Sequence, residues 1–156
     1  MQKQIARWLQ DGHSHNLLHH IGYGSDDIFM KRLTVRFAGK DEWMYKAFNI
    51  DKFPPTFSRQ HKIKPDQRLT GVSFTTSWSD GSFPLLIHLH YEANEGGKWE
   101  KQIEMEQAEA PDELRKRIKG VKSFSLAPNE LIYGFDLWVT AFSDVVTIIK
   151  IKTVMF

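Results

Sequence analysis

Two histidines one residue apart, His88 and His90, have the residue type and the spacing that best suit chemistry in this sequence. Alternate residues of a β-strand point to the same face, so both imidazoles would lie on one side of a sheet. A five-residue turn at 93–97 would bring Glu100 on the returning strand opposite His90. His88, His90 and Glu100 would then supply nitrogen and oxygen ligands for one divalent transition metal. This arrangement predicts a metal-dependent enzyme built on a β-barrel.

The same stretch also fits the solvated face of an ordinary hairpin, with no cofactor. In that interpretation His90 and Glu100 form a cross-strand pair that contributes about a few tenths of a kcal/mol. The run is similar to the glycine, His-x-His and glutamate run of the cupin family, but one additional residue separates Gly81 from His88. Both interpretations stay open at this point.

A second group of histidines lies near the N-terminus. Four of them fall within eight residues: His13, His15, His19 and His20. Imidazoles bind transition metals and change charge between about pH 5 and 7, so this segment could bind a metal or respond to pH. A partly ordered polar loop is the alternative. We treat residues 1–27 as a peripheral segment, with a short helix predicted over 2–10.

Three tryptophans, Trp43, Trp78 and Trp99, fall close to predicted turns, where binding residues tend to lie. Polar turn residues stand nearby, Asp80 after Trp78 and Asn94 before Trp99. An indole ring can stack on a sugar ring while polar neighbours bind its hydroxyl groups. The same rings could enter a membrane interface, or each could pack under its own hairpin.

Charged side chains are unevenly distributed along the chain. One predicted turn gathers basic residues, namely Arg59, His61, Lys62, Lys64 and Arg68. This turn could meet a phosphate or an acidic partner, although a solvated turn also explains it. Because an acidic stretch follows at 92–113, the molecule would be dipolar, which favours docking of a protein partner or formation of a homo-oligomer.

Composition excludes several classes of protein. A net charge of +2, from 21 basic and 19 acidic residues, is too balanced for a nucleic-acid surface. The absence of cysteine excludes disulfides, thiolate metal sites and a cysteine nucleophile. The N-terminus lacks the apolar run of a signal peptide, and the apolar C-terminal stretch is short and contains lysines. We expect no transmembrane segment, and a protein that is cytoplasmic or released without a classical signal peptide.

Hydrophobic periodicity predicts the fold class. From Ile28 onward, apolar residues alternate with polar ones and turn signals recur about every ten residues, which is typical of a β-sandwich or barrel. A proline, an acidic start and a basic end predict one helix over 111–119. The C-terminal segment 129–156 has apolar residues on both faces and predicts a central hairpin. We therefore expect one mainly β domain over 1–156, a sandwich or jelly-roll-like barrel of about seven to ten strands.

Three functions are compatible with these features. The first is a non-enzymatic, lectin-like binding module that holds a carbohydrate or another polar ligand at the tryptophan-bearing loops. The second is the metal-dependent enzyme centred on His88 and His90. The third is a protein–protein interaction module, such as an inhibitor, immunity or assembly protein. We favour the first.

Overall fold

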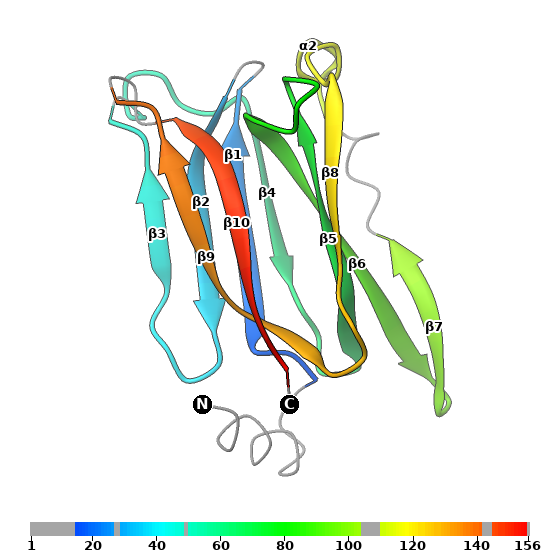
Figure 1. Ribbon diagram of the computed structural model, residues 1–156. Coiled ribbons are helices and arrows are strands. Elements are labelled where there is room, and N and C mark those ends of the chain that lie inside the picture. Colours follow the sequence, from blue (N-terminus) through cyan, green and yellow to red (C-terminus); the bar gives the residue numbers. More distant parts are fainter. Residues whose placement is uncertain (1–14, 27–28, 49, 104–109, 142–144, 156) are drawn as a thin grey trace.

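The computed structural model describes residues 15–26, 29–48, 50–103, 110–141 and 145–155. Within these ranges the chain forms ten strands in three antiparallel sheets and one short helix (Figure 1). The mainly β prediction with one short helix is confirmed. The helix predicted over 2–10 lies outside the described residues.

The first sheet has the strand order β3-β2-β1-β4. Its strands are β1 (Leu18–Ser25), β2 (Met30–Phe37), β3 (Trp43–Lys46) and β4 (Phe57–Lys62). In β1, Ile21 and Tyr23 are buried in the core, whereas the residues between them point to the opposite face. The sequence interpretation placed this stretch in a peripheral segment. The structure makes it an interior strand, paired on both sides.

The second sheet has the order β7-β6-β5-β8. Its strands are β5 (Gln67–Thr76), β6 (Pro84–Glu95), β7 (Lys98–Ile103) and β8 (Gly120–Ser125). The first half of β6, from Pro84 to Leu89, is buried, as expected for an interior strand of a sheet that is covered. The helix α2 (Asp112–Arg115) precedes β8 and buries Leu114. It lies within the predicted range 111–119.

The last two strands, β9 (Glu130–Val139) and β10 (Val146–Met155), form a separate two-stranded sheet. This hairpin packs on the first sheet, because the ring of Phe135 lies 6.0 Å from that of Phe37 in β2. The sequence predicts a central hairpin here, but Trp138 and its cross-strand partner Ile148 are exposed. The hairpin is therefore covered on one face only, and its outer face carries exposed apolar side chains.

One hydrophobic core joins the three sheets and α2. It includes Ile21 of β1, Leu33 of β2, Phe74 of β5 and Ile149 of β10, all buried. The chain reversals before β2, β4, β6 and β10 lie with α2 at one end, which Figure 1 shows at the top. We call this end the apical end. No helix among the described residues is long and apolar enough to cross a membrane.

The β6–β7 register differs from the predicted one. Glu95 pairs with Lys98 across a two-residue turn of Gly96 and Gly97, both at positive φ. The sequence predicts a five-residue turn at 93–97, which would place each residue of β7 opposite the β6 residue three positions before its observed partner. The side chain of Asn94 accepts a hydrogen bond from the Gly97 amide (2.9 Å) and stabilises the tighter turn.

Candidate functional site

The outer face of the first sheet, which points away from the core, is hollowed by two cavities of about 480 and 500 Å³. His20, Glu42 and Gln60 line both cavities, so the two form one continuous depression. We call it the Gly22 groove. Its polar lining from the sheet comprises His19, His20, Arg32, Thr34, Arg36, Lys46, Gln60 and Lys62.

The strand register assembles this lining. His20 of β1 pairs with Arg36 of β2 on one side and with Lys62 of β4 on the other. Two residues further along β1, Gly22 pairs with Thr34 and Gln60. Directly paired residues point to the same face of a sheet, so these side chains surround one strip of β1. Residues far apart in sequence therefore meet on one surface.

Glycine makes the floor of the groove. Gly22 and Gly24 occupy successive outward positions of β1, and both are buried because side chains from neighbouring segments cover the backbone there. A Cβ atom at Gly22 would lie 3.2 Å from Cγ of Gln60, and one at Gly24 would lie 2.7 Å from Cγ of Pro55. Pro55 thus packs on Gly24 and closes the apical side of the groove, while the side chain of Gln60 lies close over Gly22.

The groove carries an excess of positive charge. Arg32, Arg36, Lys46 and Lys62 line the cavities together with two carboxylates, Glu42 and Asp51. Arg32 donates a hydrogen bond to the hydroxyl of Ser58 (2.9 Å). Within the described part of the chain, the other three cations form no salt bridge. They are therefore available to an anion from solution.

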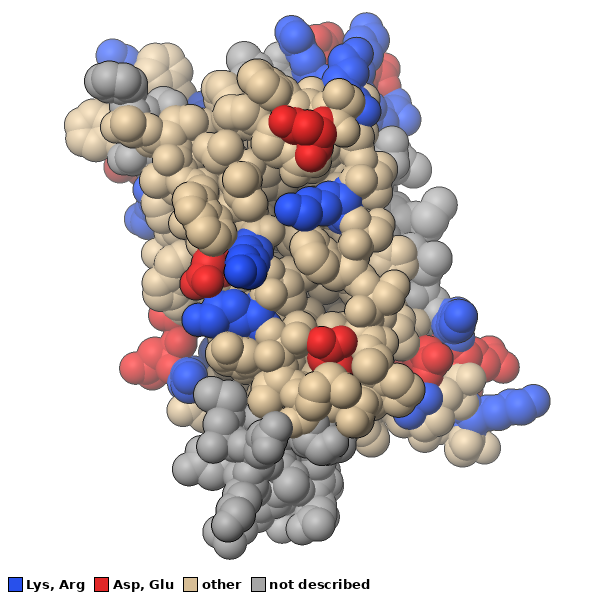
Figure 2. Space-filling view, viewed as in Figure 1, with Lys and Arg blue, Asp and Glu red and all other residues tan. Residues whose placement is uncertain are grey.

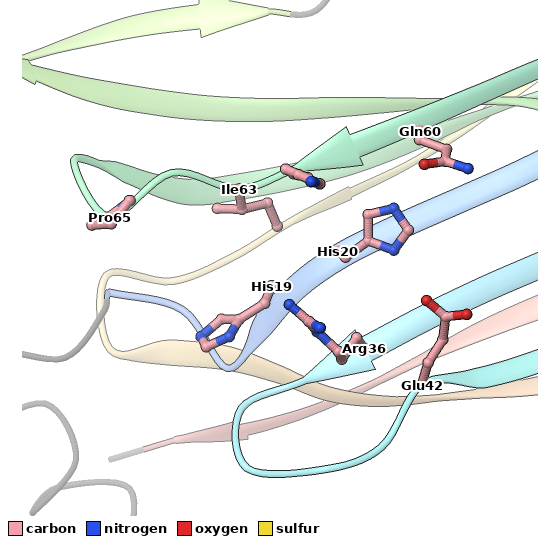
Figure 3. Close-up of a pocket in the computed structure, with 8 residues that line it drawn as sticks. His19, His20, Arg36, Glu42, Gln60, Ile63 and Pro65 are labelled. Atoms are coloured by element: carbon pink, nitrogen blue, oxygen red, sulfur yellow. The ribbon is translucent and has the colours of Figure 1, made fainter.

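The imidazole of His20 lies in the middle of this lining. Figure 3 shows it between Gln60 of β4 and Glu42, which precedes β3, with Arg36 extending into the same space. Neighbouring His19 has a pKa below its usual value, first because it is partly buried and second because of the Arg36 charge. Neutral imidazole and amide groups beside cations can bind hydroxyl groups as well as anions.

A third cavity, of about 520 Å³, lies on the second sheet. Its polar side chains bind each other. The hydroxyl of Ser73 lies 2.7 Å from Nε2 of His90 and 3.0 Å from the hydroxyl of Ser123. Arg68 donates to a carboxylate oxygen of Glu92 (2.8 Å). A serine nucleophile needs a histidine that a third group orients. The nearby carboxylate of Glu92 binds Arg68 and does not take that third role for His90.

The predicted metal ligands are not brought together as a set. Ala93 lies opposite Glu100, and Ile103 lies opposite His90, so Glu100 belongs to the other face of the hairpin. His88 is buried and pairs with Ser73. In the described ranges, no group of three or more His, Asp or Glu side chains could hold a metal ion.

The predicted tryptophan site is divided between distant places. Trp78 follows β5 at the apical end, whereas Trp99 pairs with Asn94 near the opposite tip of β6, about 30 Å away at the usual strand rise. The ring of Trp99 is covered by the guanidinium of Arg68, 4.2 Å from its centroid. Trp43 lies on the edge strand β3.

The polar members of that predicted site have structural partners. Asp80 accepts hydrogen bonds from the hydroxyl and amide of Ser82, at 2.6 and 2.9 Å. These bonds hold the pKa of Asp80 below its usual value. Asn94 caps the glycine turn described above. Turn formation therefore accounts for both residues.

The N-terminal histidines and the basic turn also separate. His19 and His20 line the Gly22 groove, while the ring of His15 lies edge-on to that of Trp99, at 5.0 Å. His13 lies outside the described residues. In the basic turn, Lys62 points into the groove and His61 points to the core.

Sequence reasoning missed most of the groove: Gly22, Gly24, Arg32, Arg36 and Gln60. The available signal was the alternation Ile21-Gly22-Tyr23-Gly24, in which large residues alternate with glycine at the strand period. No family model, curated protein or solved structure matches this chain. Its function must therefore be inferred from the geometry of the groove.

Proposed function

We propose that this protein is a non-enzymatic binding module that holds an acidic carbohydrate in the Gly22 groove. The observation that carries the proposal is a depression on the outer face of the first sheet in which Arg36, Lys46 and Lys62 are exposed around His20 and, among the described residues, form no salt bridge. This places the ligand on the face of a sheet and not at the tryptophan loops.

The chemistry of the lining favours a sugar that carries sulfate or carboxylate groups. Among the described residues, no phenylalanine, tyrosine or tryptophan lines the two cavities, so the large ring on which a neutral sugar would stack is absent there. Arg36 and Lys62 flank His20 and can bind anionic groups, since guanidinium and ammonium groups make charge-assisted hydrogen bonds. Thr34, His20 and Gln60 can donate to or accept from hydroxyl groups.

The shape of the groove fits an extended ligand. The two cavities share three lining residues and together run from Pro65, near the end opposite α2, to Pro55 beside Gly24. A chain of two or more sugar rings could lie along β1, over His20 and Gln60. Because the cations are exposed, each contact contributes little alone, and affinity requires several anionic groups.

Titration calorimetry tests the proposal. We expect a sulfated oligosaccharide to bind, a neutral oligosaccharide of equal length to bind at least about tenfold more weakly, and affinity to fall with salt. Arg36→Gln combined with Lys62→Gln should weaken binding by about tenfold or more, since two charge-assisted contacts are lost. Gly22→Val should weaken binding, since the added side chain would displace Gln60 from its place in the groove.

The matched control is Lys64→Gln combined with Lys98→Gln, which removes two exposed charges outside the groove. This control should bind the sulfated sugar like the wild type. Equal losses in the control and in the Arg36/Lys62 variant would show that net charge alone attracts the ligand. Equal affinity for neutral and sulfated sugars would also contradict the proposal.

A further inference from the structure

We propose that the part of the Gly22 groove beside Pro55 is a carboxylate-binding subsite, in which Arg32 recognises the carboxylate of a sugar acid. We call it the Arg32 subsite. The inference rests on the proposed function, because it assigns one group of the acidic ligand to one part of the same groove. It also separates this part from the other end, where Arg36 and Lys62 flank His20.

One row of residues across the first sheet builds this subsite. Lys46 of β3 pairs with Arg32 of β2. On its other side Arg32 pairs with Gly24 of β1, which pairs in turn with Ser58 of β4. Directly paired residues point to the same face of a sheet, so all these positions face the groove. The row therefore aligns two cations, a position without a side chain and a hydroxyl group.

The missing side chain at Gly24 lets Arg32 lie across β1. The Nη2 atom of Arg32 donates to the hydroxyl of Ser58 (2.9 Å), which belongs to the second strand along the sheet from β2. A Cβ atom at Gly24 would lie 3.2 Å from the same Nη2 atom. The guanidinium is thus held over the glycine, half-buried, and still lines the cavity. Because the side chain is already oriented, ligand binding costs it little conformational entropy.

A guanidinium in a fixed orientation suits a carboxylate. Ser58 uses one nitrogen of Arg32, and the N–H groups on the other nitrogens have no acceptor among the described residues. A planar fork of N–H donors matches the two oxygens of a carboxylate. Lys46, directly opposite Arg32, brings a second positive charge to the same place. Like charges directly opposite each other destabilise a sheet, so an anion bound between them relieves that repulsion.

Carboxylates in the same cavity limit the charge of the ligand. Asp51 and Glu42 line it together with Arg32 and Lys46, and neither carboxylate forms a salt bridge with a described residue. Two carboxylates beside two cations would repel a cluster of sulfate groups. A single carboxylate surrounded by sugar hydroxyl groups fits better, because the guanidinium binds the carboxylate while Asp51 and Glu42 accept hydrogen bonds from the hydroxyls.

Apolar side chains form the wall of the subsite. Met44, Ile50, Pro54 and Pro55 line the same cavity as Arg32. The C–H groups of a sugar ring can pack on such a wall while its polar groups bind the charged residues. Because Pro55 closes the apical side of the groove, the sugar that Arg32 holds is the terminal one of its chain. A terminal uronate and a terminal sialate both provide this chemistry.

Titration calorimetry with matched ligands tests the subsite. The first pair is a sulfated oligosaccharide whose only carboxylate belongs to a terminal glucuronate, and the same chain with that carboxylate reduced to an alcohol. We expect the reduction to weaken binding to the wild type by at least about tenfold, since a charge-assisted contact is lost. A sialylated oligosaccharide and its carboxyl-reduced form make the second pair. Each pair that shows the loss identifies a source of the carboxylate.

Two variants show whether Arg32 makes the contact. Arg32→Lys keeps the positive charge but loses the planar fork, so it should bind the native and the reduced chain with affinities within about twofold of each other. Ser58→Ala changes an exposed residue and removes the hydrogen bond that orients Arg32, so it should reduce the preference for the native chain about threefold. Thermal unfolding checks that both variants fold, and Ser58→Ala keeps the test valid if Arg32→Lys does not.

Two controls separate the subsite from the rest of the groove and from net charge. Arg36→Gln should weaken binding of the native and the reduced chain by the same factor, because Arg36 lies at the other end of the groove. The face of the molecule over β9 and β10, which Figure 2 shows, carries interspersed basic and acidic side chains. Lys150→Gln removes an exposed cation from β10 and should leave both affinities unchanged.

The results distinguish failure of the subsite from failure of the proposed function. If the wild type binds the native and the reduced member of each pair equally, the Arg32 subsite is wrong, while binding of the sulfated chain would still support the groove as an acidic-sugar site. A loss on reduction that persists in Arg32→Lys would overturn the role of Arg32 as well. If no acidic chain binds, the subsite and the proposed function are both wrong.

Discussion

The outer groove of the first sheet and the cavity on the second sheet have similar volumes and similar residue types, yet their side chains are organised differently. In the second cavity Arg68 is bound to Glu92 and covers Trp99, and Ser73 binds His90. In the Gly22 groove Arg36, Lys46 and Lys62 surround His20 and Gln60. Groups that satisfy each other stabilise the fold, whereas groups without such partners are free to bind a ligand.

This difference predicts which substitutions affect stability and which affect binding. Changes among packed or paired groups should lower the free energy of unfolding. Changes in the groove should leave that free energy nearly unchanged and act on ligand affinity. Three stability measurements test the distinction, and we give them from the largest expected effect to the smallest.

The largest effect concerns His61, which is buried and points away from the groove. Burial, the charge of Arg59 and then the nearby His88 and His20 lower its pKa from 6.5 to about 4. Between these values the unfolded chain binds a proton that the folded chain does not. The free energy of unfolding is therefore highest above about pH 6.5. It falls by about 3 kcal/mol as the pH drops toward 4, because the unfolded chain gains a proton at this histidine first.

Urea unfolding at a series of pH values measures this loss. His61→Gln should remove most of the slope between about pH 6.5 and 4, although partly buried His19 adds a smaller slope of the same sign. His15→Gln, a change at an exposed histidine, should leave the slope in place. A wild-type protein equally stable at both ends of this range would show that His61 is not held neutral by the fold.

The second effect compares two glycines. A Cβ atom at Gly71 would lie 2.5 Å from the backbone carbonyl oxygen of Phe124, which cannot move without breaking the β5–β8 pairing. Gly71→Ala should therefore lower the free energy of unfolding by about 2 kcal/mol. At Gly22 the nearest atom belongs to the flexible side chain of Gln60, so Gly22→Ala should change stability by less than about 0.5 kcal/mol. Thermal unfolding of both variants gives the comparison, and equal losses would contradict it.

The smallest effect compares two arginines. Arg68→Ala removes the pair with Glu92 and the cover of Trp99, and should cost about 1 kcal/mol because both contacts are partly exposed. Arg36→Ala should have no measurable effect on stability. Guanidinium unfolding distinguishes the two variants when each free energy of unfolding is reproducible to about a few tenths of a kcal/mol. A larger loss for Arg36→Ala would show that Arg36 is a structural residue.

Local patterns predicted much of the fold. Alternating residues identified most strands, and the pattern of Pro111 and the charges that follow it identified α2 within a few residues of its bounds. Asp80 and Gly81 form the predicted turn between β5 and β6. These features depend on residues close together in sequence, which is why a single sequence contains them.

The site depended on pairing between distant strands. The Gly22 groove combines four segments that span residues 19 to 65. The strand β1 itself was missed because glycine and histidine replace the usual polar half of its alternation. The His88, His90 and Glu100 set depended on one register, and a shift of three residues moved Glu100 to the other face. Short-range turn chemistry at Asn94 decided that register.

The measurement that tests the central claim most directly is an amide chemical-shift titration with a sulfated oligosaccharide. The account predicts that the largest changes occur at the backbone amides of Gly22 and Gly24 and at Gln60 of β4, with little change along the β6–β7 hairpin. Changes concentrated at Trp78 and Trp99, or in the cavity around Ser73, would show that the ligand binds elsewhere. A spectrum that does not respond to the sugar would show that the groove does not bind it.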